Sequence, residues 1–291
     1  IKMALETHIL TLSCPDRTGI AARVFSKIAA EGGFVKEAAQ FGDELSRLFF
    51  MRIVFTTDTA ESMRPVLRES FKPLAAEYKM DWKLHNGDRP ARLLLLVSKE
   101  SHCLNDLLQR WRTGLLNVDI AGVVSNHEDM REFVEWNKIP YHYLPLPAGS
   151  SFEAKRAQEN KILQLAADLR VDLVVLARYM QILSDDMCRA LQGHCINIHH
   201  SFLPSFKGAK PYHQAYERGV KLIGATAHYV TADLDEGPII EQAVERVDHT
   251  FTPAKLIAVG KDLENIVLAR AVRYHTERRI LLNGRRTVIF K

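Results

Sequence analysis

Several features that mark membrane proteins, secreted proteins and metalloproteins are missing from this sequence of 291 residues. The longest clearly apolar run, residues 93–97, is far too short to cross a lipid bilayer, and no leading stretch has the pattern of a secretion signal. The four cysteines form neither a CxxC pair nor a cluster with histidine, so we expect reduced thiols and no metal. These absences predict a cytoplasmic protein with no membrane association.

Strong charge of either sign is also missing. The formal net charge is only +4, and no basic tract is interleaved with aromatic residues, so we expect no nucleic-acid partner. The mild positive charge fits an anionic substrate and an ordinary solvated surface equally well. What the sequence does have is 47% hydrophobic and 25% charged residues, the mixture of a globular protein, and a length that suggests two domains.

A polar stretch with glycine and proline, residues 85–90, separates two regions of different pattern. In the first region, Gly32-Gly33 ends a stretch of helical periodicity, and Pro73 predicts a break or bend in a second one. The order of elements is βαββαβ, which predicts a ferredoxin-like sheet with two helices on one face. The expected strands are 7–13, 34–41, 46–56 and 80–84, and the expected helices are 17–31 and 61–78.

The turn after the first expected strand carries the motif Ser-Cys-Pro-Asp-Arg-Thr-Gly-Ile over residues 13–20. With Gly32-Gly33 and Gln40, this motif resembles ACT domains of the amino-acid-binding regulatory type. The resemblance implies an amino-acid effector bound through Asp16, Arg17 and Gly19. A purely structural pairing module is an equally good interpretation. Either way, we expect a homo-oligomer, a dimer or a tetramer.

In the second region, short apolar strands alternate with helices, which predicts a mostly parallel, doubly wound, Rossmann-like sheet. In such a sheet, ligands bind beyond the carboxyl ends of the strands. The final helix is expected to stop near Asn283-Gly284. The expected strands are 92–98, 118–125, 142–146, 171–177, 195–199, 221–230 and 238–247, and the main helices are 152–169 and 253–282.

Three polar residues at strand ends form a candidate catalytic set. Asn197 and His199 lie two residues apart on one strand, so their side chains point to the same face, and Asp235 lies in a Leu-Asp-Glu-Gly-Pro turn. An amide can hold an oxyanion, an imidazole can donate a proton, and a carboxylate can orient the imidazole or take a proton from water. Taken singly, each residue is more simply a turn former or a core histidine.

The sequence around these residues resembles folate-dependent formyltransferases and hydrolases. The motif is Asn-Ile-His-x-Ser-x-Leu-Pro from residue 197, then Gly208, then His-x-Val-x-x-x-Leu-Asp-x-Gly-Pro from residue 228. Residues 197–215 and 223–230, together with the ACT-like region, resemble the formyltetrahydrofolate deformylase family most closely. The resemblance implies that Asn197, His199 and Asp235 hydrolyse 10-formyltetrahydrofolate to formate and tetrahydrofolate, with no permanently bound cofactor. The formate would supply purine synthesis and balance the one-carbon pool.

The same resemblance places a folate pocket around two loops. The backbone of one loop would hold the pterin ring, and the other loop would lie opposite it. Ordinary core packing is the alternative for the apolar members of the first loop. The residues implied in substrate binding are Met180, Gln181, Ile182, Leu183, His200, Gly208, His228, Ala232 and Leu234. The whole chain is then an α/β protein with an ACT domain at residues 1–86 and a formyltransferase-type domain at residues 87–291.

One absence favours water over an amine as the acceptor of the formyl group. Related glycinamide ribonucleotide transformylases hold the substrate phosphate in a glycine-rich loop after the first strand of this domain, because backbone N–H groups must approach the anion. Here no glycine occurs between Gly87 and Gly114, and Glu100 would repel a phosphate, although Lys99 is an alternative anchor. Formyl transfer to an amine, such as glycinamide ribonucleotide, remains the alternative, and a folate-binding sensor without catalysis is a third hypothesis.

Overall fold

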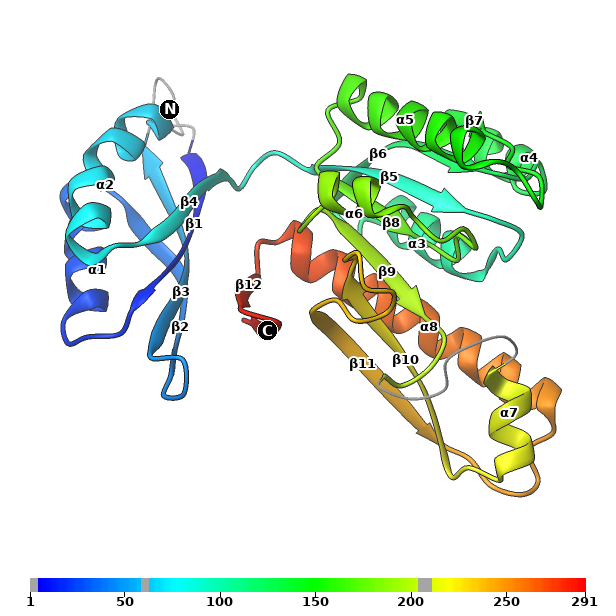
Figure 1. Ribbon diagram of the computed structural model, residues 1–291. Coiled ribbons are helices and arrows are strands. Elements are labelled where there is room, and N and C mark those ends of the chain that lie inside the picture. Colours follow the sequence, from blue (N-terminus) through cyan, green and yellow to red (C-terminus); the bar gives the residue numbers. More distant parts are fainter. Residues whose placement is uncertain (1–4, 59–62, 204–210) are drawn as a thin grey trace. The chain divides into compact units, whose positions relative to one another are not determined.

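The computed structural model describes residues 5–58, 63–203 and 211–291. The chain divides into two compact units, residues 1–90 together with 274–291, and residues 91–273 (Figure 1). Within the described part of the chain, each helix is too short or too polar to traverse a bilayer.

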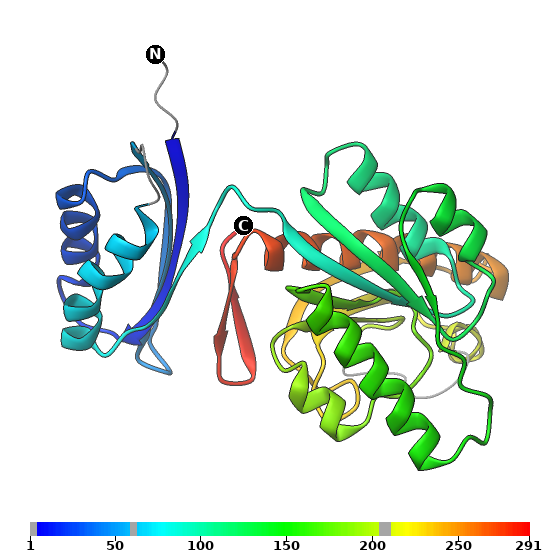
Figure 2. The ribbon, with the colours of Figure 1, turned by 90° about the horizontal axis from the view of Figure 1, so that it is seen from above.

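The first unit contains a four-stranded antiparallel sheet in the order β2-β3-β1-β4. Helices α1 and α2 both cover one face of this sheet (Figure 2). The predicted ferredoxin-like βαββαβ fold is thereby confirmed. Its elements are β1 (Leu5–Pro15), α1 (Ile20–Ala30), β2 (Phe34–Asp43), β3 (Leu48–Asp58), α2 (Arg64–Tyr78) and β4 (Asp81–Asn86).

The two helices of this unit follow from their apolar spacing. Val24 and Ile28 of α1 and Phe71 of α2 are buried in one core cluster against the sheet. Helix α1 ends just before the glycine pair. A Cβ on Gly33 would lie 2.5 Å from the side chain of Ile28, so this position requires glycine. Helix α2 runs through Pro73 as one element, so the expected break is absent. Burial of the apolar residues on both sides of the proline holds that helix together.

The end of the chain differs from the prediction. The helix expected at residues 253–282 ends at Thr276, and a hairpin of β12 (Ile280–Asn283) and β13 (Arg286–Ile289) follows. Asn-Gly begins the tight hairpin turn instead of stopping a helix, and the β-favouring Thr-Val-Ile segment completes the second strand. The hairpin groups with the first unit, whereas the sequence assigned it to the second. Asn283 Nδ2 donates to Asp43 Oδ2 at 2.6 Å within this unit.

The second unit is built on a seven-stranded sheet in the order β11-β10-β9-β8-β5-β6-β7. Strands β5 to β9 run parallel, and β10 and β11 are antiparallel. The predicted doubly wound fold is confirmed. The strands are β5 (Ala91–Val97), β6 (Val118–Ser125), β7 (Tyr141–Tyr143), β8 (Leu173–Leu176), β9 (Cys195–His199), β10 (Leu222–Tyr229) and β11 (Ile239–Arg246).

Helices cover both faces of this sheet (Figures 1 and 2). Helices α5 and α6 pack on the face that carries Leu94 and Leu96, whereas α3 and α8 lie on the other face. Because β5, β8 and β9 are adjacent and parallel, the segments that follow them emerge at one edge. The helices are α3 (His102–Arg112), α4 (Arg131–Trp136), α5 (Phe152–Asp168), α6 (Asp185–Ala190), α7 (Pro211–Arg218) and α8 (Pro253–Thr276).

Candidate active site

Strand pairing brings two parts of the predicted site together. In the antiparallel pair of β9 and β10, Asn197 lies opposite His228, and His199 lies opposite Thr226. His199 is 7% exposed and His228 is 2% exposed. Residues that are far apart in sequence therefore meet as cross-strand neighbours, and two of the expected side chains lie on the same face of β9.

Asp235 contacts both histidines from the turn that follows β10. His199 Nδ1 lies 3.2 Å from Asp235 Oδ2, and His228 Nε2 lies 3.6 Å from Asp235 Oδ1. Burial by itself would raise the pKa of this carboxyl, but hydrogen bonds from the two histidines outweigh it and bring the pKa far below its ordinary value. Asp235 is therefore an ionised carboxylate beside two imidazole rings.

The turn that presents Asp235 explains the glycine of the motif. Asp235 adopts a left-handed conformation with φ of 58°, which aspartate tolerates better than most residues. A Cβ on Gly237 would lie 1.7 Å from the carbonyl oxygen of Tyr229. Only glycine lets the turn fold back this closely onto β10, so Gly237 holds the carboxylate in reach of His199.

The second nitrogen of His199 is buried and has no hydrogen-bond partner within the described residues. With Nδ1 donating to Asp235, this Nε2 donates only when the ring is an imidazolium. A buried polar atom without a partner is rare away from functional sites. Nε2 is thus suited to an oxygen or nitrogen atom of a bound substrate.

His228 contacts both Asn197 and Asp235. His228 Nδ1 donates to the carbonyl oxygen of Tyr229 at 2.9 Å, because a carbonyl only accepts. Its Nε2 lies 3.4 Å from Asn197 Nδ2. The sequence placed His228 among the substrate-binding residues, and the structure places it in contact with two of the proposed catalytic residues.

A buried threonine fixes the chain just after His199. Thr226 Oγ1 donates to the carbonyl oxygen of Ser201 at 2.9 Å and accepts from the backbone N–H of Leu203 at 3.1 Å. Gln242 Nε2 donates to the same hydroxyl oxygen at 2.9 Å. Sequence reasoning missed Gln242, since only the register of β10 and β11 brings it opposite Thr226.

His200 contacts a charged residue that the sequence reasoning also missed. Arg178 Nη1 lies 2.6 Å from His200 Nδ1, and the His200 ring stacks on that of His199 with centroids 5.0 Å apart. Burial, and then the charge of Arg178, lower the pKa of His200 to about 4. His200 is therefore a neutral imidazole at pH 7.

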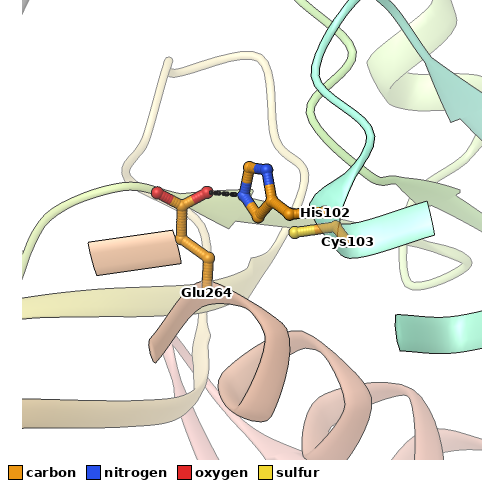
Figure 3. A group of neighbouring side chains, drawn as sticks. All are labelled: His102, Cys103 and Glu264. Carbon is orange, nitrogen blue, oxygen red and sulfur yellow. Dashed lines mark hydrogen bonds and ion pairs between the residues drawn. The ribbon is translucent and has the colours of Figure 1, made fainter. Parts of the chain in front are cut away.

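Arg178 contacts a compact polar cluster, whose members are drawn in Figure 3. The ligand-type atoms of His102, Cys103 and Glu264 lie within 4.8 Å of one another. His102 Nε2 is 2.7 Å from Glu264 Oε2, and the Arg178 guanidinium is 3.5 Å from the same oxygen. That cation repels a metal, and burial raises the pKa of the Cys103 thiol well above its ordinary value, although a metal needs the thiolate. These residues fit a hydrogen-bonded network better than a metal site.

The predicted folate loop after β8 is largely open to solvent. Met180 is 57% exposed and Ile182 is 63% exposed, so core packing does not account for them, whereas Leu183 packs against the core cluster. The backbone N–H of Met180 donates to Ser98 Oγ at 3.0 Å. Gln181 lines a cavity of about 560 Å³ at the ends of β6 and β7.

The opposite loop is exposed as well. Leu234 is 57% exposed, and Ala232 also faces solvent. Large apolar side chains on two loops beside a polar centre are typical of a surface that a flat apolar ligand covers. The expected contact at Gly208 lies outside the described residues.

In the first unit, the residues of the predicted effector site are exposed and occupied by local contacts. Arg17 stacks on the ring of Tyr78 at 3.8 Å and donates to the carbonyl oxygen of Glu77 at 2.9 Å. Gly19 has φ of 91° at the start of α1, a conformation that favours glycine. The backbone N–H of Asp16 donates to the carbonyl oxygen of Arg47.

Comparisons with known proteins show the family of this chain. The formyl transferase family matches residues 91–272. A formyltetrahydrofolate deformylase of Corynebacterium sp. (strain P-1) is 47% identical, with 98% of each chain covered. The crystal structure of formyltetrahydrofolate deformylase from Burkholderia mallei is 49% identical with a TM-score of 0.91, covering 98% of this chain and 100% of that one.

A transferase is a more distant relative. The crystal structure of glycinamide ribonucleotide transformylase 1 from Symbiobacterium toebii is 31% identical with a TM-score of 0.65, covering 72% of this chain and 98% of that one. The deformylases match both units, whereas this transferase leaves more than a quarter of the chain unmatched. The chain therefore belongs to the formyl transferase family and, within it, to the formyltetrahydrofolate deformylases.

Proposed function

We propose that this protein hydrolyses 10-formyltetrahydrofolate to formate and tetrahydrofolate. The observation that carries the proposal is the constellation at the end of β9. There, an amide, a buried imidazole and an ionised carboxylate converge beside exposed apolar loops, and one imidazole nitrogen has no hydrogen-bond partner among the described residues. Such a set suits attack by water on an acyl carbon.

In the proposed reaction, the oxygen of a water molecule attacks the formyl carbon. Asn197 Nδ2 and the Nε2–H of the His199 imidazolium donate hydrogen bonds to the oxyanion that forms. The bond between the formyl carbon and N10 then breaks. One proton from the water reaches N10, the other passes to solvent, and formate leaves. Asp235 orients His199 through its Nδ1 and is the acceptor we propose for the first proton.

The segment after β5 favours water over an amine that carries a phosphate. Glu100 forms an ion pair with Lys261 Nζ at 2.6 Å, and His102 binds Glu264. The place where transferases would use open backbone N–H groups therefore carries one carboxylate, Glu100, paired to helix α8. An incoming phosphate would meet this carboxylate, so the transfer reaction loses its anchor.

A formate assay with the purified protein tests the proposed function. We expect formate and tetrahydrofolate in equal amounts from 10-formyltetrahydrofolate, with or without an added amine. Labelled formyl that appears in glycinamide ribonucleotide instead would support the transfer alternative. If neither product forms, the sensor hypothesis is favoured.

Asn197→Ala should lower formate release on the order of 10²–10³-fold, because one oxyanion donor is lost. Asn160→Ala is the matched control, since Asn160 is exposed on helix α5. Near-native turnover of Asn197→Ala, with an unchanged circular dichroism spectrum, would contradict the assigned role.

The remaining expectations belong to the same proposal. The first unit would act as an ACT domain that binds an amino acid or joins copies of the chain into a dimer or tetramer. The enzyme would work in the cytoplasm without nucleic acid and without a bound cofactor. The formate that it releases would supply purine synthesis. Control by an amino acid makes physical sense, because unchecked hydrolysis would drain the pool of formylated folate.

A further inference from the structure

Arg178 has an unusual backbone conformation beside the proposed site. It lies two residues after the end of β8, and its φ of 65° lies in the left-handed region that residues with side chains rarely adopt. Such a conformation persists only where surrounding contacts hold it, and it occurs preferentially at functional sites. The contacts that hold Arg178 are those of its guanidinium with His200 and Glu264.

The contact with His200 has a definite direction. Arginine stays protonated in proteins, and its guanidinium only donates. Since Arg178 Nη1 lies 2.6 Å from His200 Nδ1, that ring nitrogen must accept the hydrogen bond. In a neutral imidazole the proton then resides on the other nitrogen, Nε2.

We propose that Arg178 is a positioning residue that locks His200 in the tautomer with its proton on Nε2. This inference rests on the proposed function, in which His200 lies beside the catalytic residues. In this tautomer His200 donates a hydrogen bond to the oxygen of the attacking water or of the formyl group. It does not take the proton from the water.

Glu264 anchors Arg178 from helix α8. Glu264 is 1% exposed, and its two oxygens contact three side chains. Oε2 faces His102 and Arg178, and Oε1 accepts from the hydroxyl of Tyr212 at 3.0 Å. The charge of Arg178 is therefore balanced by a buried carboxylate that cannot rotate away without losing these bonds.

A glycine makes room for this arrangement. A Cβ on Gly260 would lie 2.1 Å from the ring of Tyr212, so the tyrosine packs against the helix because residue 260 is glycine. Gly260 lies one turn before Glu264 on the same face of α8. The stacking of His200 on His199 and its low pKa agree with a ring that stays neutral.

Nitrogen-15 NMR of histidine side chains tests the tautomer directly. The sequence has 12 histidines, and the signal that disappears in His200→Asn identifies His200. We expect Nε2 to be protonated and Nδ1 to be unprotonated at neutral pH. A His200 that carries its proton on Nδ1 would overturn the proposal. The spectrum needs no substrate, so it is independent of the formate assay that tests the proposed function.

Arg178→Met tests the positioning role. We expect kcat to fall about tenfold to a hundredfold, the size of one lost hydrogen bond to a charged group, while KM changes less than about threefold. The His200 spectrum should lose its single tautomer. Arg178→Lys, which keeps a donor, should recover part of the activity. Arg189→Met, at an exposed ion pair on α6, is the matched control and should leave turnover unchanged.

Two further outcomes would overturn the inference. One is an Arg178→Met enzyme whose kcat falls while the His200 tautomer stays as in the native protein. The other is one equivalent of zinc in the purified native enzyme, because a metal on Glu264 and His102 would displace the guanidinium. If Arg178→Met does not fold, the native spectrum and Arg178→Lys still decide the question.

Discussion

Each unit of this protein presents a short motif of charged and small residues at the end of a strand, and the two motifs differ in what their side chains contact. In the first unit, Asp16, Arg17 and Gly19 are exposed, and Arg17 is already bound to the end of helix α2. In the second unit, His199 and Asp235 are largely buried and bind each other, and one imidazole nitrogen has no partner in the part of the chain that the structure describes.

The difference shows how a catalytic site and a surface turn can be told apart. Burying polar groups costs free energy, so a buried set with an unsatisfied nitrogen persists where another molecule completes it. An exposed arginine that stacks on tyrosine needs no ligand, because water and neighbouring groups satisfy it. The second unit therefore carries the stronger evidence of chemistry, and the first unit carries evidence of local stabilisation.

The largest expected effect is at Asp235. Asp235→Asn removes the carboxylate that orients His199 and accepts a proton from the water, so formate release should fall at least on the order of 10²–10³-fold. Asp233→Asn, an exposed neighbour in the same turn, is the control and should retain native turnover. An Asp235→Asn enzyme with more than a tenth of native activity would remove the contrast between the two units.

A smaller effect is expected in the pH dependence of stability. The folded pKa of His200 is about 4 against an ordinary 6.5, so the unfolded chain binds more protons between these values. The free energy of unfolding should therefore be highest above pH 6.5 and fall by up to about 3 kcal/mol as the pH approaches 4. The charged or titratable groups that act on His200 are Arg178, His199, Glu264 and Asp235.

Urea denaturation of the native protein and of His200→Asn, at several pH values, measures this contribution. The variant should lose less stability on acidification than the native protein does. Asp235 affects the pH dependence of stability only at lower pH. A carboxylate with a depressed pKa loses its stabilising effect as the pH falls below its ordinary pKa. If the free energy of unfolding falls equally with pH in the two proteins, His200 is not held neutral by the fold.

The smallest effects are expected in the first unit. Arg17→Ala should lower the free energy of unfolding by about 1 kcal/mol, through loss of the stacking on Tyr78 and of one hydrogen bond. Without an effector, its turnover should equal that of the native enzyme. A screen of the twenty amino acids for changes in turnover or melting temperature would sharpen the comparison. A response that Arg17→Ala abolishes would give the first unit a binding site of its own.

Much of the fold was predictable because its signals are local. The apolar periodicity of α1, the glycine pair that ends it and the buried strands β5, β6 and β9 all appear in contiguous residues. The C-terminal hairpin was missed because its Asn-Gly pair is compatible with a helix end and with a hairpin turn. The contact of Asn283 with Asp43 joins residues far apart in the sequence, and no local pattern reveals it.

The candidate site was predictable to a similar extent. Asn197, His199 and Asp235 lie in a motif that the sequence displays directly. Arg178, Glu264 and Gln242 lie in no recognisable motif, although the structure brings the first two beside His200 and the third onto Thr226. Their roles depend on which strands and helices become neighbours.

The order of residues along the chain by itself determined the two folding patterns, the proposed catalytic residues and the family. These follow from hydrophobic spacing and from side-chain chemistry within short segments. Only the tertiary structure decided which nitrogen of His199 faces Asp235, which tautomer Arg178 imposes on His200 and which carboxylate neutralises Arg178. Those properties depend on distances of a few ångströms between separate elements, because hydrogen bonds and buried charges act only at short range.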